Sequence, residues 1–112
     1  MEYRNDTLCG IFHNQALRYQ DAFPFLSARF DENGMPTGTF RNTTWARARE
    51  QVLSLAQGLI SLGLNQGRNV ILLSESRPEW IIADQAIQAC GAVGVPLYPT
   101  LTRDELAYMV MD

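Results

Sequence analysis

Apolar residues recur at helical spacing between residues 45 and 62, the longest periodic stretch of the chain. Polar side chains such as Arg47 and Glu50 fall on the opposite face, as in an amphipathic helix that packs on a core. Thr44 before the stretch is a good N-cap, and Gly63 after it suits a left-handed C-terminal cap. We therefore predict one helix whose inward stripe is Trp45, Ala48, Val52, Leu55, Ala56, Leu59 and Leu62.

A shorter helix and a hairpin are predicted before it. Thr7 caps a helix that runs to about Tyr19, with Leu8, Ile11, Phe12 and Leu17 available to pack inward. Phe23-Pro24 ends this helix. A strand over Phe25–Phe30 and its return over Gly38–Asn42 follow, joined by the turn residues Asp31–Gly34 and an exposed Met35-Pro36. We expect this hairpin at the edge of the sheet.

The second half of the chain alternates strands and helices. Val70–Leu73 and Val93–Leu97 are short apolar runs of the kind found in buried parallel strands. Between them Glu79–Cys90 is apolar on nearly every side, so this helix should be largely buried, with Pro78 at its first position. Thr102 opens a last helix whose inward residues are predicted to be Leu106, Met109 and Val110.

This order predicts an α/β fold made of a helix, a β-hairpin and then a βαβα unit with parallel strands, flanking helices and a right-handed crossover. The 112 residues amount to one domain or part of one, without repeats, linkers or low-complexity segments. Apolar residues make up 46% and charged residues 19%, which is typical of a folded soluble protein and not of a disordered tail.

Charge excludes some classes of function. The net charge of -3 is spread along the chain, so no basic cluster suggests a nucleic-acid partner. All nine basic residues are arginine. The absence of lysine excludes both a phosphate loop that ends in Gly-Lys-Ser/Thr and Schiff-base chemistry.

Cys9 and Cys90 lie far apart in sequence, which favours two structural thiols in a reducing compartment over a disulfide. The polar start "MEYRNDTLCG" does not resemble a signal peptide, and the longest apolar runs are too short to span a bilayer. We expect a cytoplasmic protein whose contact with membranes is at most peripheral.

The stretch "ACGAVGVPLYPT" has two glycines three residues apart, as some phosphate-binding loops do. Gly91, however, follows the C-terminal end of a predicted helix, where the helix dipole is negative and repels phosphate. Gly91 and Gly94 are therefore interpreted as a helix cap and a close approach of helix to strand.

The stretch "SESRPEW" lies at the favourable pole, after a strand and before a helix. Ser74, Ser76 and Arg77 are placed to meet an anionic ligand there. Glu75 and Glu79 oppose this, because acidic residues in a first helical turn usually stabilise the helix dipole. Capping is the favoured interpretation.

The remaining polar and aromatic candidates have structural interpretations. Asp84 interrupts an apolar helix and is expected to pair with an arginine or with backbone amides. His13 is expected to be a surface or packing residue, and Trp45 and Trp80 are expected to be core anchors. No spacing of Cys, His or Asp suggests a metal site. The sequence thus assigns no catalytic, cofactor-binding or metal residue.

Residues 68–112 nevertheless resemble the N-terminal region of AMP-forming acyl-CoA synthetases, in the adenylate-forming superfamily, and "TLCGIFHNQALRYQDAFPFL" is similar to the family's opening helix and first strand. "NTTWARARE" resembles the first core motif through Thr44 and Trp45, and "ACGAVGVPLYPT" the second through Gly91 and Pro96. The segments "RPEW", "AD" and "VPLYPTL" are most similar to the long-chain fatty-acid branch. Departures from the family pattern are Arg47, Ala48 and Ser76.

This resemblance implies the N-terminal part of the large domain of such an enzyme, with residues 1–112 as a fragment of the AMP-binding domain and the catalytic remainder and C-terminal domain outside it. The implied reaction joins ATP and a fatty acid into an acyl-adenylate, from which coenzyme A displaces AMP. ATP, Mg²⁺ and coenzyme A belong to the full enzyme, with no cofactor expected in this fragment. No catalytic residue is carried over, and the fragment alone is expected to be inactive.

The expected partners are the remainder of the parent polypeptide and a second copy of the chain, through an exposed sheet edge. The ending "YMVMD" favours truncation, because another strand would complete a further βαβ step. An alternative is a free-standing interaction or regulatory module derived from such an enzyme. A small nucleotide-binding domain is the weakest interpretation, because no phosphate-binding glycine loop opens a helix.

Overall fold

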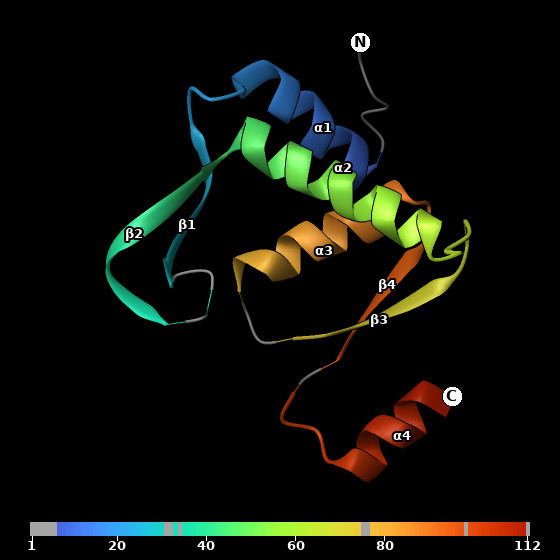
Figure 1. The fold of residues 1–112 in the computed structure, drawn as a ribbon. Helices are drawn as coiled ribbons and strands as arrows, with labels where there is room; N and C mark the ends of the chain where they lie inside the picture. The colour runs from blue at the N-terminus through green and yellow to red at the C-terminus, as the bar shows by residue number, and fades with distance from the viewer. Residues whose placement is uncertain (1–6, 31–32, 34, 75–76, 98, 112) are drawn as a thin grey trace.

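The computed structural model describes residues 7–30, 33, 35–74, 77–97 and 99–111. Helices and strands follow one another much as the sequence predicts (Figure 1). In chain order they are α1 (Leu8–Tyr19), β1 (Pro24–Phe30), β2 (Pro36–Thr44), α2 (Trp45–Ser61), β3 (Asn69–Leu73), α3 (Pro78–Ala89), β4 (Val93–Leu97) and α4 (Arg103–Met111).

The core lies where α1, α2 and α3 pack together. Its buried members are Phe12, Ala48, Val52, Ala56, Ile82 and Ala86. Alanines contribute half of this set, so the helices approach one another closely along α2. Trp45 and Leu59 lie at the margin of the cluster, partly buried.

Helix α1 begins as predicted but turns a different face inward. The Thr7 Oγ1 accepts a hydrogen bond from the Gly10 amide at 3.0 Å, which confirms the N-cap. Phe12 is buried as expected, but the predicted inward residues Leu8, Ile11 and Leu17 are exposed. The buried face is instead Gly10, Phe12, His13 and Ala16. Small residues on this face allow α1 to lie close against α2, and the larger aliphatic side chains fall outside the contact.

Helix α2 confirms both predicted ends. Its C-terminus is a Schellman motif: the Leu64 amide bonds the Leu59 carbonyl at 3.1 Å, and the Gly63 amide bonds the Ile60 carbonyl at 2.9 Å. Gly63 has φ +99°, the left-handed conformation expected of it. Leu55 and Leu62 were predicted to face inward but are exposed, Leu62 because it is the C-cap beyond the packed turns.

Strands β1 and β2 form an antiparallel hairpin that is longer than predicted, and β2 leads directly into α2. The two strands make a two-stranded sheet of their own in the described part of the chain. The expectation that the hairpin lies at the edge of the parallel sheet is therefore wrong. Met35 is exposed as predicted, Pro36 belongs to β2, and the predicted turn residues Asp31, Glu32 and Gly34 lie outside the described residues.

Strands β3 and β4 pair in parallel with α3 as their crossover, as predicted. Pro78 takes the first helical position, and Ile82, Ala86 and Ile87 are buried. The strands are not buried on both faces, because Ile71 and Leu73 are 43% and 48% exposed. Helix α3 covers one face of the pair, while the other stays open.

Helix α4 is well formed but lies apart from the core (Figure 1). The Glu105 amide bonds the Thr102 Oγ1 at 3.2 Å and the Thr102 amide bonds the Glu105 carboxylate at 3.4 Å, a reciprocal capping box. Of its predicted inward residues, Leu106 is half-buried, whereas Met109 and Val110 are exposed. The apolar pattern of α4 therefore predicts an inward face, but no described element covers Met109 and Val110 on that face.

Candidate functional site

The carboxyl edge of the parallel strands is the first place to look for a ligand site, because open α/β sheets bind ligands there. Leu73 and Leu97 are paired in register, so both strands end at this edge. Ser74 follows β3 directly and is half-buried. Ser76, also a candidate from the sequence, and Glu75, which was expected to oppose an anion there, lie outside the described residues.

Arg77 lies at this edge as the N-cap of α3, but its guanidinium group already forms an ion pair with Glu79. Its Nε donates to the Glu79 carboxylate at 3.2 Å, and both side chains are largely exposed. Arg77 makes no side-chain capping bond, and Pro78 has no amide hydrogen to offer a ligand. Glu79 lies in the first turn, where its charge stabilises the helix dipole. The geometry favours a helix start stabilised by the charge of Glu79 over an anion site.

Gly91 forms the end of α3 and not a phosphate cradle. It has φ +73°, and its amide bonds the Gln88 carbonyl at 2.9 Å while the Ala92 amide bonds the Ile87 carbonyl at 3.2 Å. This is a second Schellman motif. The Gly91 carbonyl in turn accepts from the Gly67 amide at 2.9 Å, which joins the turn before β3 to the turn before β4.

Gly94 and Asp84 meet where α3 crosses the sheet. A Cβ atom on Gly94 would lie 3.3 Å from the Asp84 Oδ1, so the predicted close approach of helix to strand is confirmed. The partner of the half-buried Asp84 is different from the one expected. The Gln88 side-chain amide, one helical turn away, donates to its carboxylate at 3.0 Å.

His13 is a buried packing residue and not a surface residue. It is 2% exposed, and its ring meets the Phe12 ring edge-on with centroids 5.1 Å apart. Burial lowers the pKa of His13, and the positive charge of Arg49 lowers it further. The imidazole is therefore held neutral inside the helical layer.

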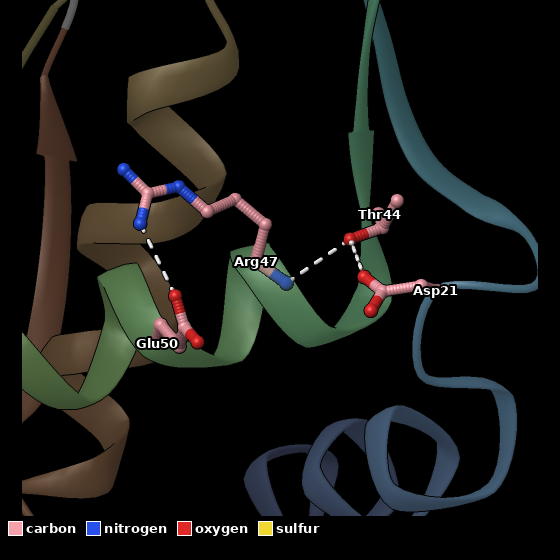
Figure 2. Close-up of polar contacts among 4 residues, drawn as sticks. All are labelled: Asp21, Thr44, Arg47 and Glu50. Atoms are coloured by element: carbon pink, nitrogen blue, oxygen red, sulfur yellow. Dashed lines mark hydrogen bonds and ion pairs between the residues drawn. The ribbon is translucent and has the colours of Figure 1, made fainter.

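Thr44 and Trp45 join α2 to the chain that precedes it (Figure 2). The Thr44 Oγ1 accepts from the Arg47 amide at 3.2 Å and donates to the Asp21 carboxylate at 2.9 Å. Arg47 also forms an exposed ion pair with Glu50 at 3.1 Å. Asp21 was missed from the sequence, since no local pattern marks an acid that accepts a hydrogen bond from a capping hydroxyl 23 residues away.

Aromatic packing fixes the same junction from the inside. The Trp45 ring lies 4.6 Å from the Phe25 ring centroid, 5.8 Å from that of Tyr19 and 5.9 Å from that of Phe12. Trp45 is thus the core anchor that was predicted, and Trp80 is half-buried in α3. The junction is a structural device that sets α2 against α1 and β1.

Metal ligands and surface depressions are the remaining features of the described residues that bear on a site. No three Cys, His, Asp or Glu side chains in this part of the chain come together to hold a metal ion. An open depression on α2 is lined by Arg47, Glu50, Gln51, Ser54 and Leu55, with Arg47 and Glu50 already paired. Among the described residues, none of the helices combines the length and the apolar character that crossing a bilayer requires.

Comparison with known proteins gives consistent matches. The family model described as AMP-binding enzyme matches residues 12–112. The long-chain-fatty-acid–CoA ligase FadD15 of Mycobacterium tuberculosis is 41% identical over 75 residues, which are 67% of this chain and 12% of the ligase. The peroxisomal long chain acyl-CoA synthetase 6 of Arabidopsis thaliana is 31% identical over 104 residues, which are 93% of this chain and 15% of the synthetase.

Solved structures agree in fold. IdnL1 superposes with a TM-score of 0.81 at 20% identity, over 96% of this chain and 21% of its own. The N-terminal subdomain of Klebsiella oxytoca NpsA superposes with a TM-score of 0.73 at 25% identity, over 99% of this chain and 25% of its own. The chain therefore spans a quarter or less of the length of these four proteins.

Proposed function

Because this chain belongs to the AMP-binding enzyme family, we propose that it forms the N-terminal part of the adenylating domain of a long-chain fatty acid–CoA ligase. The proposed whole enzyme joins ATP and a fatty acid into an acyl-adenylate with release of pyrophosphate, and the coenzyme A thiol then displaces AMP. The names of the FadD15 ligase and of the plant synthetases support the substrate class.

The residues described here do not fit the groups this reaction needs. ATP and Mg²⁺ call for a phosphate cradle with cationic partners and for clustered oxygen ligands. Gly91 caps a helix at its negative pole, and Arg77 is paired with Glu79. The described part of the chain has no cluster of metal ligands. We therefore propose that other parts of the enzyme hold ATP, Mg²⁺ and coenzyme A, and that this chain alone is inactive.

The observation that carries the proposal is the unfinished packing of the second half. Ile71, Leu73 and Val93 are exposed on the open face of the parallel strands, and Tyr108, Met109, Val110 and Met111 on α4 are exposed as well. A self-sufficient domain does not usually leave a sheet face and an amphipathic helix uncovered together. The remainder of a larger adenylating domain is the partner that would complete this layer.

We include a cytoplasmic location and at most peripheral membrane contact in the proposal. This part of the proposal is supported by the even spread of charge along the chain and by the two cysteines, which are free thiols in the structure. Separation of cell extracts into soluble and membrane fractions, followed by immunodetection, tests this part.

A chimera tests the function. The corresponding N-terminal segment of the FadD15 ligase is replaced by this chain, and fatty acid-dependent ATP–pyrophosphate exchange and acyl-CoA formation are measured. We expect activity within about tenfold of the parent ligase, a loss of roughly 1.4 kcal/mol of transition-state stabilisation or less. A matched chimera with an α/β segment of equal length from an unrelated fold should be inactive. A folded but inactive chimera, or exchange activity in the isolated chain, contradicts the proposal.

A further inference from the structure

The two cysteines lie one helical turn from residues of the same buried cluster. Cys9 is three residues before Phe12 on α1, and Cys90 is four residues after Ala86 at the C-cap of α3. Phe12 and Ala86 belong to one cluster, and Cys90 packs against it. Cys9 lies three, four and seven residues before the buried Phe12, His13 and Ala16, and Cys90 lies four residues after the buried Ala86, so both thiols belong to the inward faces of their helices.

The directions of the helices place these two positions at the same end of the helical layer. Helices α1 and α3 are in contact and run in opposite directions (Figure 1). The start of α1, which lies before Phe12, and the end of α3, which lies after Ala86, are therefore at the same end of the helical layer. At that end the Cys90 Sγ donates a hydrogen bond to the Ala56 carbonyl on α2 at 3.5 Å.

The environment of both thiols favours their protonated form. Burial raises the pKa of Cys9, and the nearby Cys90 raises it further; burial also raises the pKa of Cys90. The influence of Cys90 on Cys9 agrees with their placement at one end of the layer. Since the thiolate is the reactive form, oxidation needs a sustained excess of disulfide or a raised pH.

We propose that Cys9 and Cys90 are a redox modification site that closes into a reversible intramolecular disulfide in the presence of a small-molecule disulfide. One thiolate attacks glutathione disulfide, forms a mixed disulfide and releases one glutathione thiolate. The second thiolate attacks the protein sulfur of that mixed disulfide and releases the other glutathione. Two protein thiols are oxidised, one glutathione disulfide is reduced to two thiols, and α1 becomes tied to α3. This inference does not depend on the proposed function.

The test is oxidation of the reduced 112-residue chain by glutathione disulfide at about pH 8.5, near the ordinary thiol pKa. Non-reducing peptide mapping by mass spectrometry should find the Cys9 and Cys90 peptides joined in a monomer. Because the bond closes a long loop, we expect the melting temperature to rise by on the order of 10 °C and to return with dithiothreitol. Cys9→Ser and Cys90→Ser should each abolish the bond and the rise.

A displaced thiol is the matched geometric control. Leu8 is 70% exposed, so the double variant Leu8→Cys with Cys9→Ser moves the thiol to the outer face of α1 with little disturbance of packing. This variant should not form the bond with Cys90. Equal bond formation in the displaced variant would show that chain flexibility and not the packed geometry joins the thiols. Unreacted thiols, stable mixed disulfides or bonds between chains in the original protein would also overturn the inference.

Discussion

His13 is a titratable side chain that is buried among the helices, where its charged form is disfavoured. The unfolded imidazole titrates near 6.5, and burial lowers the pKa of His13 in the folded chain. Below that unfolded value the unfolded state binds more protons, so the free energy of unfolding falls as the pH drops, whereas the full contribution is present at higher pH.

We therefore expect lower stability at about pH 5.5 than at about pH 7.5, measured by urea unfolding near and above the ordinary imidazole pKa. His13→Gln should reduce this difference, and His13 is the only histidine of the chain, so no other imidazole contributes. An unchanged pH dependence in the variant would show that other groups cause it.

Gly91 and Gly63 allow the energetic cost of backbone strain to be measured separately from the cost of a steric clash. Both have positive φ, where an L side chain costs roughly 1–2 kcal/mol. A Cβ atom at Gly63 would meet nothing within 4 Å, but one at Gly91 would lie 2.8 Å from the Gln66 Cγ.

Urea unfolding should therefore show a greater loss of stability for Gly91→Ala than for Gly63→Ala. Adding Gln66→Ala, which removes the clashing atom, should bring the first loss close to the second. Equal losses in the two single variants would mean that Gln66 moves aside freely.

At the scale of helices and strands, Thr44 connects α2 to the segment that precedes β1, so its substitution should lower the free energy of unfolding. Thr44→Ala removes the N-cap of α2 and the bond to Asp21, so we expect a loss of about 1 kcal/mol or somewhat more. Thr44→Ser keeps the hydroxyl and should lose much less. Urea unfolding in an Asp21→Ala background separates the two bonds, because the cap remains there while the carboxylate is gone. Equal losses for Ala and Ser would contradict the hydrogen-bonding account.

Helix ends were predictable from the sequence, whereas helix faces were only partly so. Thr7, Thr44, Gly63 and Gly91 act through bonds within three or four residues, which are local chemistry. The inward face of α1 depends on which stripe α2 covers, so the pattern misplaced Leu17. The partner of Asp84 was likewise a side chain on its own helix, although an arginine or backbone amides were expected.

In the candidate site, too, features set by local chemistry could be predicted from the sequence, whereas contacts set by side-chain placement could not. The polarity of a helix is local, so the sequence was sufficient to interpret Gly91 as a cap and not a phosphate ligand. The Arg77–Glu79 pair and the Asp21–Thr44 bond depend on side-chain placement that no spacing fixes. Thr44 and Gly91, which carry much of the family resemblance, are thus residues that build the scaffold.

At the scale of the whole molecule, the open face of the parallel strands should govern how the isolated chain behaves. Ile71 and Val93 are both exposed on this face, and exposed apolar patches with free strand edges favour association. We expect the average mass measured by sedimentation equilibrium to rise with concentration.

Ile71→Thr combined with Val93→Thr should weaken this association without unfolding the chain, because threonine keeps the β-branched shape that suits a strand. Val70 provides the matched control, since it is half-buried and pairs in register with Gly94, which lies against α3. Val70→Thr should lower the free energy of unfolding and leave the association unchanged. A chain that stays monomeric at high concentration, with its circular dichroism intact, would show that the exposed face does not drive association. In the complete enzyme of the proposal the same face is covered, so the double variant there should impair folding instead.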